Sequence, residues 1–331
     1  MSLISKNNKI FIAGSKGMVG SAIKRKLNNL GYNNLLCPSR DELNLLDNEK
    51  VIKWYKKNRP EVVILTAAKV GGIYANNTYP VNFLLDNLKI QNNVIENAWR
   101  NDVQRLLFLG SSCIYPKHSK QPIKEDELLN GYLEKTNESY AIAKISGIKL
   151  CQALRKQYEF DAISLMPTNL YGQGDNYNDM NSHVLPALLK RFHSHKLENK
   201  ESIECWGSGR PRREFMHVED LADACIFALK NWDPSNKNSP KNKFGEPLEW
   251  LNVGTGKDIS IKDLALMISD ITLFKGNIIW DQKKPDGTFQ KLLDISKLNS
   301  LGWCSKISLV EGLNKTYQDY KKKFKDNNIR N

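Results

Sequence analysis

The chain has 331 residues and a formal net charge of +13 at pH 7, and 40% of its residues are hydrophobic. One compact core seldom serves so long a chain, so we expect two lobes or an enlarged α/β domain. No apolar run approaches the ~20 residues of a membrane span, and the amino terminus lacks a signal-peptide hydrophobic segment, so we expect no membrane association.

The spacing of the cysteines and the distribution of the lysines argue against metal binding and nucleic-acid binding. The six cysteines include no Cys-x-x-Cys pair and no Cys/His cluster with zinc spacing, so we expect reduced thiols, no metal site and a cytoplasmic location. The lysines are scattered except for a run at Lys321–Lys325, and no nucleic-acid motif is visible. We therefore expect the positive charge to favour an anionic small molecule rather than nucleic acid.

The first unit is a strand, a glycine-rich turn and a helix. Lys9–Ala13 is a short apolar run typical of a buried strand, and an amphipathic helix is predicted to end near Leu30. Between them lies Gly14-Ser-Lys-Gly17-Met-Val-Gly20, where glycines let the backbone approach a pyrophosphate at the start of the helix. The context predicts a dinucleotide site. The spacing is Gly-x-x-Gly-x-x-Gly, and a turn without a ligand is the alternative.

The second strand is predicted at 34–37 and is followed by Arg40. An acidic residue at this place would bind the ribose hydroxyls of NAD, whereas an arginine can make a bidentate contact with a 2′-phosphate. The sequence therefore favours NADP. The alternative is that Arg40 pairs with the neighbouring Asp41 or Glu42.

A further strand, Arg105–Leu109, ends in Gly110-Ser111-Ser112-Cys113. Residues just past the carboxyl end of a parallel strand face the ligand. Ser111 can donate a hydrogen bond to a carbonyl oxygen, and Cys113 can exchange a proton with carbon. The alternative for Cys113 is a small buried hydrophobic residue.

Tyr140 and Lys144 are four residues apart in a predicted helix, so their side chains share one face. We expect the ammonium to lower the pKa of the phenol, which could then exchange a proton with a substrate oxygen near neutral pH. The alternative is that the two side chains only contact each other on an exposed helix, through the ring and the aliphatic part of the lysine.

Alternation of strands and helices predicts parallel βαβ units. The fold class is α/β, a Rossmann-like doubly wound parallel sheet with a smaller α/β substrate-binding lobe. We expect an NADP-binding domain at 1–172, to which 215–255 returns, and a sugar-binding lobe at 173–214 and 256–331. Further strands are predicted at 61–66, 161–167 and 251–254, helices at 48–58, 82–100 and 137–157, and an exposed polar loop at 231–249.

The second lobe contains an aromatic residue and several arginines, which suit a nucleotide diphosphate. Trp206 and Arg213 lie in a loop-rich stretch, and Arg191 lies on a predicted helix. His183 precedes that helix and is either a proton carrier or a helix cap. The charged segment 284–291 either closes over a ligand or is a solvated turn.

Together these stretches resemble the extended short-chain dehydrogenase/reductase superfamily and, within it, the family of GDP-L-fucose synthases, over nearly the whole chain. The Ser-Ser-Cys turn and the Ser-His-Val step are more specific than the glycine turn or Tyr-x-x-x-Lys. One departure is the loop 231–249, which is longer than the family needs. The stretches that carry the resemblance are 67–72, 110–116, 140–144, 166–172, 181–184, 206–209, 213–215 and 284–287.

The resemblance implies a role for each matching residue. Tyr140 with Lys144 would donate the proton in a reduction, Ser111 would hold the keto oxygen, and Cys113 and His183 would carry protons at C3 and C5 of a sugar. The GDP-sugar would be bound by Arg191, Trp206, Arg213 and Asp286, with Lys291 nearby. NADP(H) would be bound by Gly14, Ser15, Lys16, Gly17, Met18, Val19, Gly20, Arg40, Leu109, Gly110, Ser111, Ser112, Lys144, Pro167, Thr168, Asn169, Leu170 and His183.

The implied activity is NADPH-dependent 3,5-epimerisation and 4-reduction of GDP-4-keto-6-deoxy-D-mannose to GDP-L-fucose, by a homodimer formed through the helices at 82–100 and 137–157. An alternative is a related enzyme acting on another GDP-4-keto-sugar, such as a heptose. A 4,6-dehydratase would want an acidic residue beside a Thr at the turn 111–113, where none occurs. A silent NADP-binding regulator would not need Tyr140, Lys144, Cys113 and His183.

Overall fold

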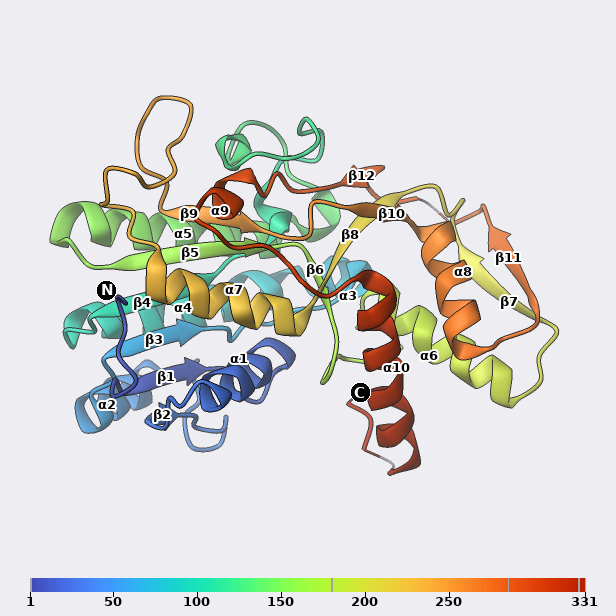
Figure 1. Ribbon diagram of the computed structural model, residues 1–331, viewed down its shortest axis with the longest axis horizontal. Coiled ribbons are helices and arrows are strands. Elements are labelled where there is room, and N and C mark those ends of the chain that lie inside the picture. The colour runs from blue at the N-terminus through green and yellow to red at the C-terminus, as the bar shows by residue number, and fades with distance from the viewer. Residues whose placement is uncertain (1, 180, 285, 327, 331) are drawn as a thin grey trace.

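A computed structural model describes residues 2–179, 181–284, 286–326 and 328–330 (Figure 1). Its main sheet has six parallel strands in the order β2-β1-β3-β4-β5-β9. This confirms the predicted doubly wound α/β fold. The strands are β1 (Ile10–Ala13), β2 (Leu35–Leu36), β3 (Val62–Leu65), β4 (Arg105–Leu109), β5 (Ala162–Pro167) and β9 (Trp250–Val253).

Helices cover both faces of this sheet. Ile10 and Ile12 of β1 pack into one core with α1 (Met18–Asn29) and α7 (Val218–Asn231). Phe11, which points to the opposite face, packs into a second core. Burial on both faces explains why the strands are continuous apolar runs rather than alternating ones. The second core also contains residues of α2 (Asn48–Asn58), α4 (Pro80–Arg100) and α5 (Glu138–Tyr158).

The strand order places the expected ligand edge. The chain goes from β1 to β2 on one side and then to β3 on the other side of β1. Ligands of open α/β sheets bind beyond the carboxyl ends of the strands at such a reversal. The segments that leave the sheet at this edge include 14–20 after β1, 66–72 after β3 and 110–113 after β4.

The second lobe is built from short elements that the sequence did not predict as strands. A small sheet has the order β10-β8-β12, with β6 also paired to β8, and β7 pairs with β11. The boundary at residue 172 stays a prediction. The elements are β6 (Asn169–Tyr171), α6 (Val184–Leu197), β7 (Ser202–Trp206), β8 (Arg212–His217), β10 (Asp258–Ser260), α8 (Ile261–Thr272), β11 (Asn277–Asp281), β12 (Gln290–Lys291) and α10 (Leu309–Lys325).

Short helices lie between the larger elements. Three of them are 3₁₀ helices, labelled η. They are α3 (Ile73–Thr78), η1 (Ser112–Ile114), η2 (Glu125–Glu127), η3 (Lys135–Asn137) and α9 (Ser296–Ser300).

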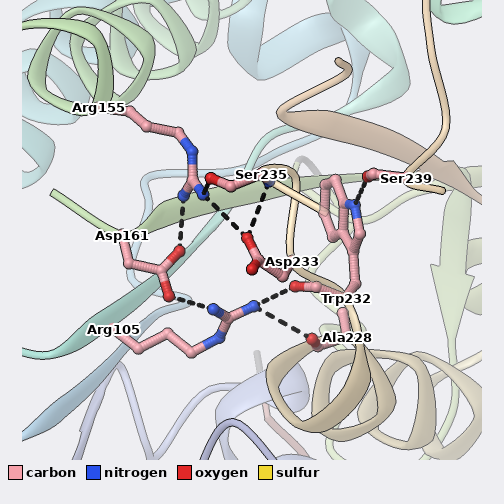
Figure 2. Close-up of polar contacts among 8 residues, drawn as sticks. All are labelled: Arg105, Arg155, Asp161, Ala228, Trp232, Asp233, Ser235 and Ser239. Atoms are coloured by element: carbon pink, nitrogen blue, oxygen red, sulfur yellow. Dashed lines mark hydrogen bonds and ion pairs between the residues drawn. The ribbon is translucent and has the colours of Figure 1, made fainter. Parts of the chain in front are cut away.

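The segment 231–249 is only partly the exposed loop that we expected. Phe244 is 75% exposed, but Trp232 is fully buried. Figure 2 shows why its start is fixed: the buried Arg105 guanidinium donates to the backbone oxygens of Ala228 and Trp232 and pairs with Asp161. A buried guanidinium requires such partners. The network therefore holds the end of α7 against β4 and β5.

Candidate active site

The glycine-rich turn joins β1 to α1 as predicted. Gly14 has a φ of +93°, and a Cβ there would lie 2.7 Å from the backbone nitrogen of Ala67, so a larger residue would not fit. Helix α1 begins after Gly17 without a side-chain cap and without an acidic residue in its first turn. Its first N–H groups and its positive end are therefore available to an anion, which fits a dinucleotide pyrophosphate.

Arg40 lies in the loop after β2 and is exposed. Within the described ranges no hydrogen bond or ion pair engages its guanidinium, and the Glu42 carboxylate instead accepts from the Ser39 N–H at 2.6 Å. The alternative pairing of Arg40 with Asp41 or Glu42 is therefore wrong. The free guanidinium suits a phosphate group.

Two predicted cofactor residues have structural partners for their side chains. The Thr168 hydroxyl and the Asn169 amide donate to the backbone oxygen of Glu214 at 3.2 and 2.8 Å. Leu170 packs against the core beneath α1 and α7. Any contact of this stretch with a cofactor would therefore come largely from its backbone.

Helix α5 places Tyr140 and Lys144 one turn apart, and β4 with η1 supplies Ser111 and Cys113. The Lys144 Nζ lies 5.9 Å from the centre of the Tyr140 ring and donates to the backbone oxygen of Leu109 at 2.8 Å. The Ser111 hydroxyl interacts with the Tyr140 phenol and accepts from the Cys113 N–H at 3.2 Å. The predicted phenol, hydroxyl and thiol are thus brought together.

The expected acidification of the phenol by Lys144 is wrong for the protein alone. Burial raises the pKa of Tyr140, the nearby Cys113 raises it further, and only Ser111 opposes this. Burial also lowers the pKa of Lys144 to about 7, which weakens it as a source of positive charge. The phenol is therefore protonated at neutral pH, and this is the form that donates a proton.

The Cys113 sulfur lies beside residues from three other elements. The Asn137 Nδ2 donates to it at 3.4 Å, and the Lys291 Nζ lies 3.9 Å away. Burial lowers the pKa of Arg213, and the neighbouring Cys113, Asp286 and Glu134 raise it in turn. Sequence reasoning missed Asn137, although its place just before the helix of Tyr140 marks it as a helix cap.

His183 occupies the N-cap position of α6, but its side chain makes no capping hydrogen bond, so the helix-cap alternative is not what the structure shows. The side chain is reached by solvent, yet desolvation by the surrounding protein lowers its pKa. The imidazole is therefore neutral at pH 7 and able to accept a proton.

Close packing connects the His183 segment to the phenol. The Gly72 N–H donates to the Asn181 oxygen at 3.1 Å, and a Cβ on Gly71 would lie 3.1 Å from the Phe83 ring. The Phe83 ring in turn meets Tyr140 edge-to-face, with centroids 6.4 Å apart. The loop 66–72 and Phe83 therefore connect the segment just before His183 to Tyr140.

The predicted substrate residues form two groups. Arg213 of β8 and Lys291 of β12 are register partners, and both lie beside Cys113. Trp206, at the end of β7, is 66% exposed. Asp286 accepts from the Ser208 N–H at 2.8 Å and from its hydroxyl at 2.6 Å, which lowers the pKa of Asp286.

Arg191 lies on α6, and its guanidinium donates to the backbone oxygen of Glu204, two residues before Trp206. The segment 284–291 is tied to the same region, because the Lys284 Nζ lies 5.4 Å above the Trp206 ring. Arg191, Trp206 and Asp286 thus lie on one side of the second lobe. Arg213 lies near both Asp286 and Cys113, and so connects this group of residues to the thiol.

Across the described residues, no three or more His, Cys, Asp or Glu side chains are grouped so that they could hold a metal ion. No helix in the described ranges is long and apolar enough to cross a bilayer.

The fold and the site define a Rossmann-like dinucleotide-binding protein with a serine–tyrosine–lysine group at the carboxyl edge of its sheet. Residues 10–242 match the family model described as "NAD dependent epimerase/dehydratase family", and the chain belongs to this family. The predicted superfamily is therefore confirmed.

Similar proteins carry more specific names. "Putative GDP-L-fucose synthase 2" of Arabidopsis thaliana is 53% identical over 96% of this chain and 93% of its own. "GDP-L-fucose synthase" of Escherichia coli strain K12 is 51% identical over 94% and 95%. Among solved structures, a GDP-mannoheptose C4 reductase from Campylobacter jejuni with NADP bound is 40% identical, covers 96% and 99%, and has a TM-score of 0.86.

Proposed function

We propose that this protein catalyses the NADPH-dependent 3,5-epimerisation and 4-reduction of GDP-4-keto-6-deoxy-D-mannose to GDP-L-fucose. The observation that carries the proposal is the meeting of Cys113, Ser111 and Tyr140 beside two cations of the second lobe. A reductase requires the phenol, whereas an additional thiol beside it suits proton exchange at carbon. The names of relatives at 51–53% identity support the substrate.

The first stage needs proton exchange next to the C4 ketone. That ketone acidifies the hydrogens at C3 and C5, and Cys113 and His183 would remove and return protons there on opposite faces of the ring. Negative charge that develops on the ketone oxygen would be stabilised by hydrogen bonds from Ser111 and Tyr140.

The second stage needs a proton at the same oxygen. When bound, NADPH supplies the hydride that reaches C4. Tyr140 would give its proton to the C4 oxygen, and its raised pKa keeps that proton in place beforehand. General acid catalysis of this kind contributes about 10²–10⁴-fold in rate. Lys144, bound to the Leu109 oxygen, would orient the cofactor and the phenol.

The cofactor would lie along the open end of α1, with its 2′-phosphate at Arg40. The NADP-bound C. jejuni reductase supports this choice of cofactor. We propose residues 1–172 with 215–255 as the NADP-binding domain, and 173–214 with 256–331 as the GDP-sugar lobe. In that lobe Arg191 and Arg213 would pair with the diphosphate, and Trp206 would stack on the base.

The direct test is incubation of the purified protein with GDP-4-keto-6-deoxymannose and NADPH in D₂O, with the product followed by NMR. We expect GDP-L-fucose that carries deuterium at C3 and C5, with one NADPH oxidised per product. Cofactor binding without turnover of any GDP-keto-sugar would reject the proposal and favour a regulator.

A second candidate is a C4 reductase or epimerase for another GDP-4-keto-sugar, such as a heptose, which the C. jejuni neighbour favours. The same experiment separates the two. Reduction of a GDP-4-keto-heptose in preference to the 6-deoxy sugar, or reduction without deuterium at C3 and C5, would select this candidate.

The assembly and location are further parts of the proposal. We propose a homodimer formed through α4 and α5, which pack against each other and keep apolar side chains exposed. We also propose a cytoplasmic location, which agrees with six cysteines that form no disulfide.

A further inference from the structure

Asn137 is placed where a capping residue stands but does not act as one. It is the N-cap residue of α5, yet its side chain makes no hydrogen bond to the first turn of that helix. Its amide nitrogen instead donates to the Cys113 sulfur at 3.4 Å, and its Oδ1 is buried without a partner in the described part of the chain. Asn is a favoured N-cap residue because its side-chain oxygen accepts a hydrogen bond from an N–H of the first turn. The Asn137 side chain makes no such bond and contacts the Cys113 sulfur instead.

Lys291 approaches the same sulfur from another direction. Its Nζ lies 3.9 Å from the sulfur, and no carboxylate in the described ranges forms an ion pair with it. An ammonium group can donate hydrogen bonds but cannot accept them, and the Asn137 amide nitrogen also only donates. Both contacts therefore suit an anionic sulfur, which only accepts hydrogen bonds, better than a thiol, which also needs an acceptor for its own S–H.

We propose that Asn137 and Lys291 are positioning residues that hold the Cys113 sulfur as an anion, ready to accept the carbon-bound proton in the epimerisation. The proposal rests on the proposed function for its substrate. It assigns Lys291 to the sulfur rather than to the GDP group, and it gives Asn137 a role that the sequence did not suggest.

The other groups around the sulfur do not replace these two. From α5 the sulfur faces the Tyr140 phenol, which is neutral at pH 7, and from β8 it faces Arg213. Asp286 and Glu134 also lie near Arg213 and raise its pKa. Lys291 from β12 lies 3.9 Å from the sulfur, and no carboxylate within the described ranges forms an ion pair with it.

The chemical step is balanced without another reactant. The sulfur anion takes a proton from the carbon beside the ketone and an S–H bond forms. The electron pair of the broken C–H bond becomes the C=C bond of an enolate, and the π pair of the ketone moves to its oxygen. Ser111 and Tyr140 can donate to that oxygen. A proton that His183 takes up from solvent is then given to the carbon on the opposite face, and the thiol releases its proton to solvent, which completes the inversion and restores the sulfur anion.

The test is the pH dependence of iodoacetamide alkylation, measured on the whole protein without substrate by mass spectrometry of the Cys113 peptide. Variants are Lys291→Met, Asn137→Leu and the conservative Lys291→Arg. Lys284→Met, in the same segment, is the matched control. The exposed Cys304 provides an internal reference in every sample.

We expect Lys291→Met and Asn137→Leu each to slow alkylation of Cys113 about tenfold at pH 7, because hydrogen bonds to a charged group are the stronger ones. The pH of half-maximal rate should rise by roughly one unit. Lys291→Arg should recover most of the effect, and Lys284→Met and Cys304 should not change. Circular dichroism melting identifies any variant that fails to fold, and the other of the two variants, Lys291→Met or Asn137→Leu, then carries the comparison.

Unchanged Cys113 profiles in folded Lys291→Met and Asn137→Leu would overturn the proposal, even if the wild-type protein makes GDP-L-fucose. Shifted profiles in a protein that turns over no GDP-keto-sugar would support the sulfur assignment and reject the proposed function. Equal effects on Cys304 would mean a general change in reactivity and would also overturn the proposal.

Discussion

At the scale of single residues, the proposed reduction depends on Tyr140 as its proton donor. Tyr140→Phe removes the proton donor and keeps the ring contact with Phe83. We expect hydride transfer to slow by about 10²–10⁴-fold, because the proton must then come from water. Single-turnover oxidation of NADPH and of NADPH deuterated at the transferred position measures this. An unchanged rate with an unchanged primary isotope effect would contradict the role.

Arg40 is the residue that we propose to select NADP over NAD. Since its guanidinium is exposed and unpaired in the described ranges, we expect Arg40→Ala to weaken NADPH binding about tenfold, the order of one lost charge-assisted contact. NADH binding should hardly change. Fluorescence titration with both cofactors measures the two affinities, and Lys53→Ala on α2 is the control. Equal losses for NADPH and NADH would mean that Arg40 does not read the 2′-phosphate.

At the scale of elements, Glu125 of η2 connects its loop to β9. Its Oε1 accepts from the Asn252 N–H at 2.9 Å, and the side chain is 1% exposed. Burial raises the pKa of Glu125 from 4.5 to about 7, although the Asn252 hydrogen bond opposes the shift. Between these two values the folded state binds more protons than the unfolded state. Stability should therefore fall as pH rises from 4.5 to 7 and then level off.

Glu125→Gln keeps the acceptor oxygen but removes the titration. We expect the variant to lack this part of the pH dependence, which amounts to roughly 3.5 kcal/mol at most, since one pKa unit corresponds to ~1.4 kcal/mol. Urea unfolding at pH 5 and pH 8 measures it, and Glu127→Gln in the same turn is the control. A wild-type slope that survives in Glu125→Gln would assign the dependence to other groups.

The elements also show what the sequence could reveal. The strands of the main sheet are buried on both faces, so their apolar runs identified them, and β4 was predicted with its observed bounds. Strand β8 begins with two arginines and a glutamate, and β12 has two residues. Strand β12 has no apolar residue, and in β8 four consecutive residues are buried although two of them are the polar Glu214 and His217, so neither strand reads as an apolar run or as an alternating one.

Those site residues whose location follows from their position in the chain could be predicted from the sequence. Ser111 and Cys113 directly follow a parallel strand, so the fold places them at the ligand edge. The contacts of Cys113 with Asn137 and Lys291 join residues 24 and 178 positions apart. No local pattern encodes such contacts, and the raised pKa of Tyr140 likewise depends on burial that only the packed fold supplies.

At the scale of the whole molecule, the outer surface of α4 and α5 is an exposed apolar feature near the site. These helices cover the face of the sheet opposite α1 and α7 (Figure 1). Val81 and Leu85, one turn apart on α4, are 68% and 45% exposed, and Ile142 on α5 is 43% exposed. Ile142 lies between Tyr140 and Lys144 in sequence, so an interface here would pack directly behind the catalytic helix.

This position makes the dimer testable. We expect the double variant Leu85→Asp, Ile142→Asp to be monomeric, because a dimer interface would bury both new charges without partners. Light scattering at micromolar concentration should give the mass of two chains for the wild-type protein and of one chain for the variant. Val310→Asp, at a 51% exposed apolar residue on α10, should remain dimeric. A monomeric wild-type protein would show that this surface forms no dimer. A double variant that still dimerises would show that the dimer forms through another surface, since two buried charges should not be tolerated in the interface.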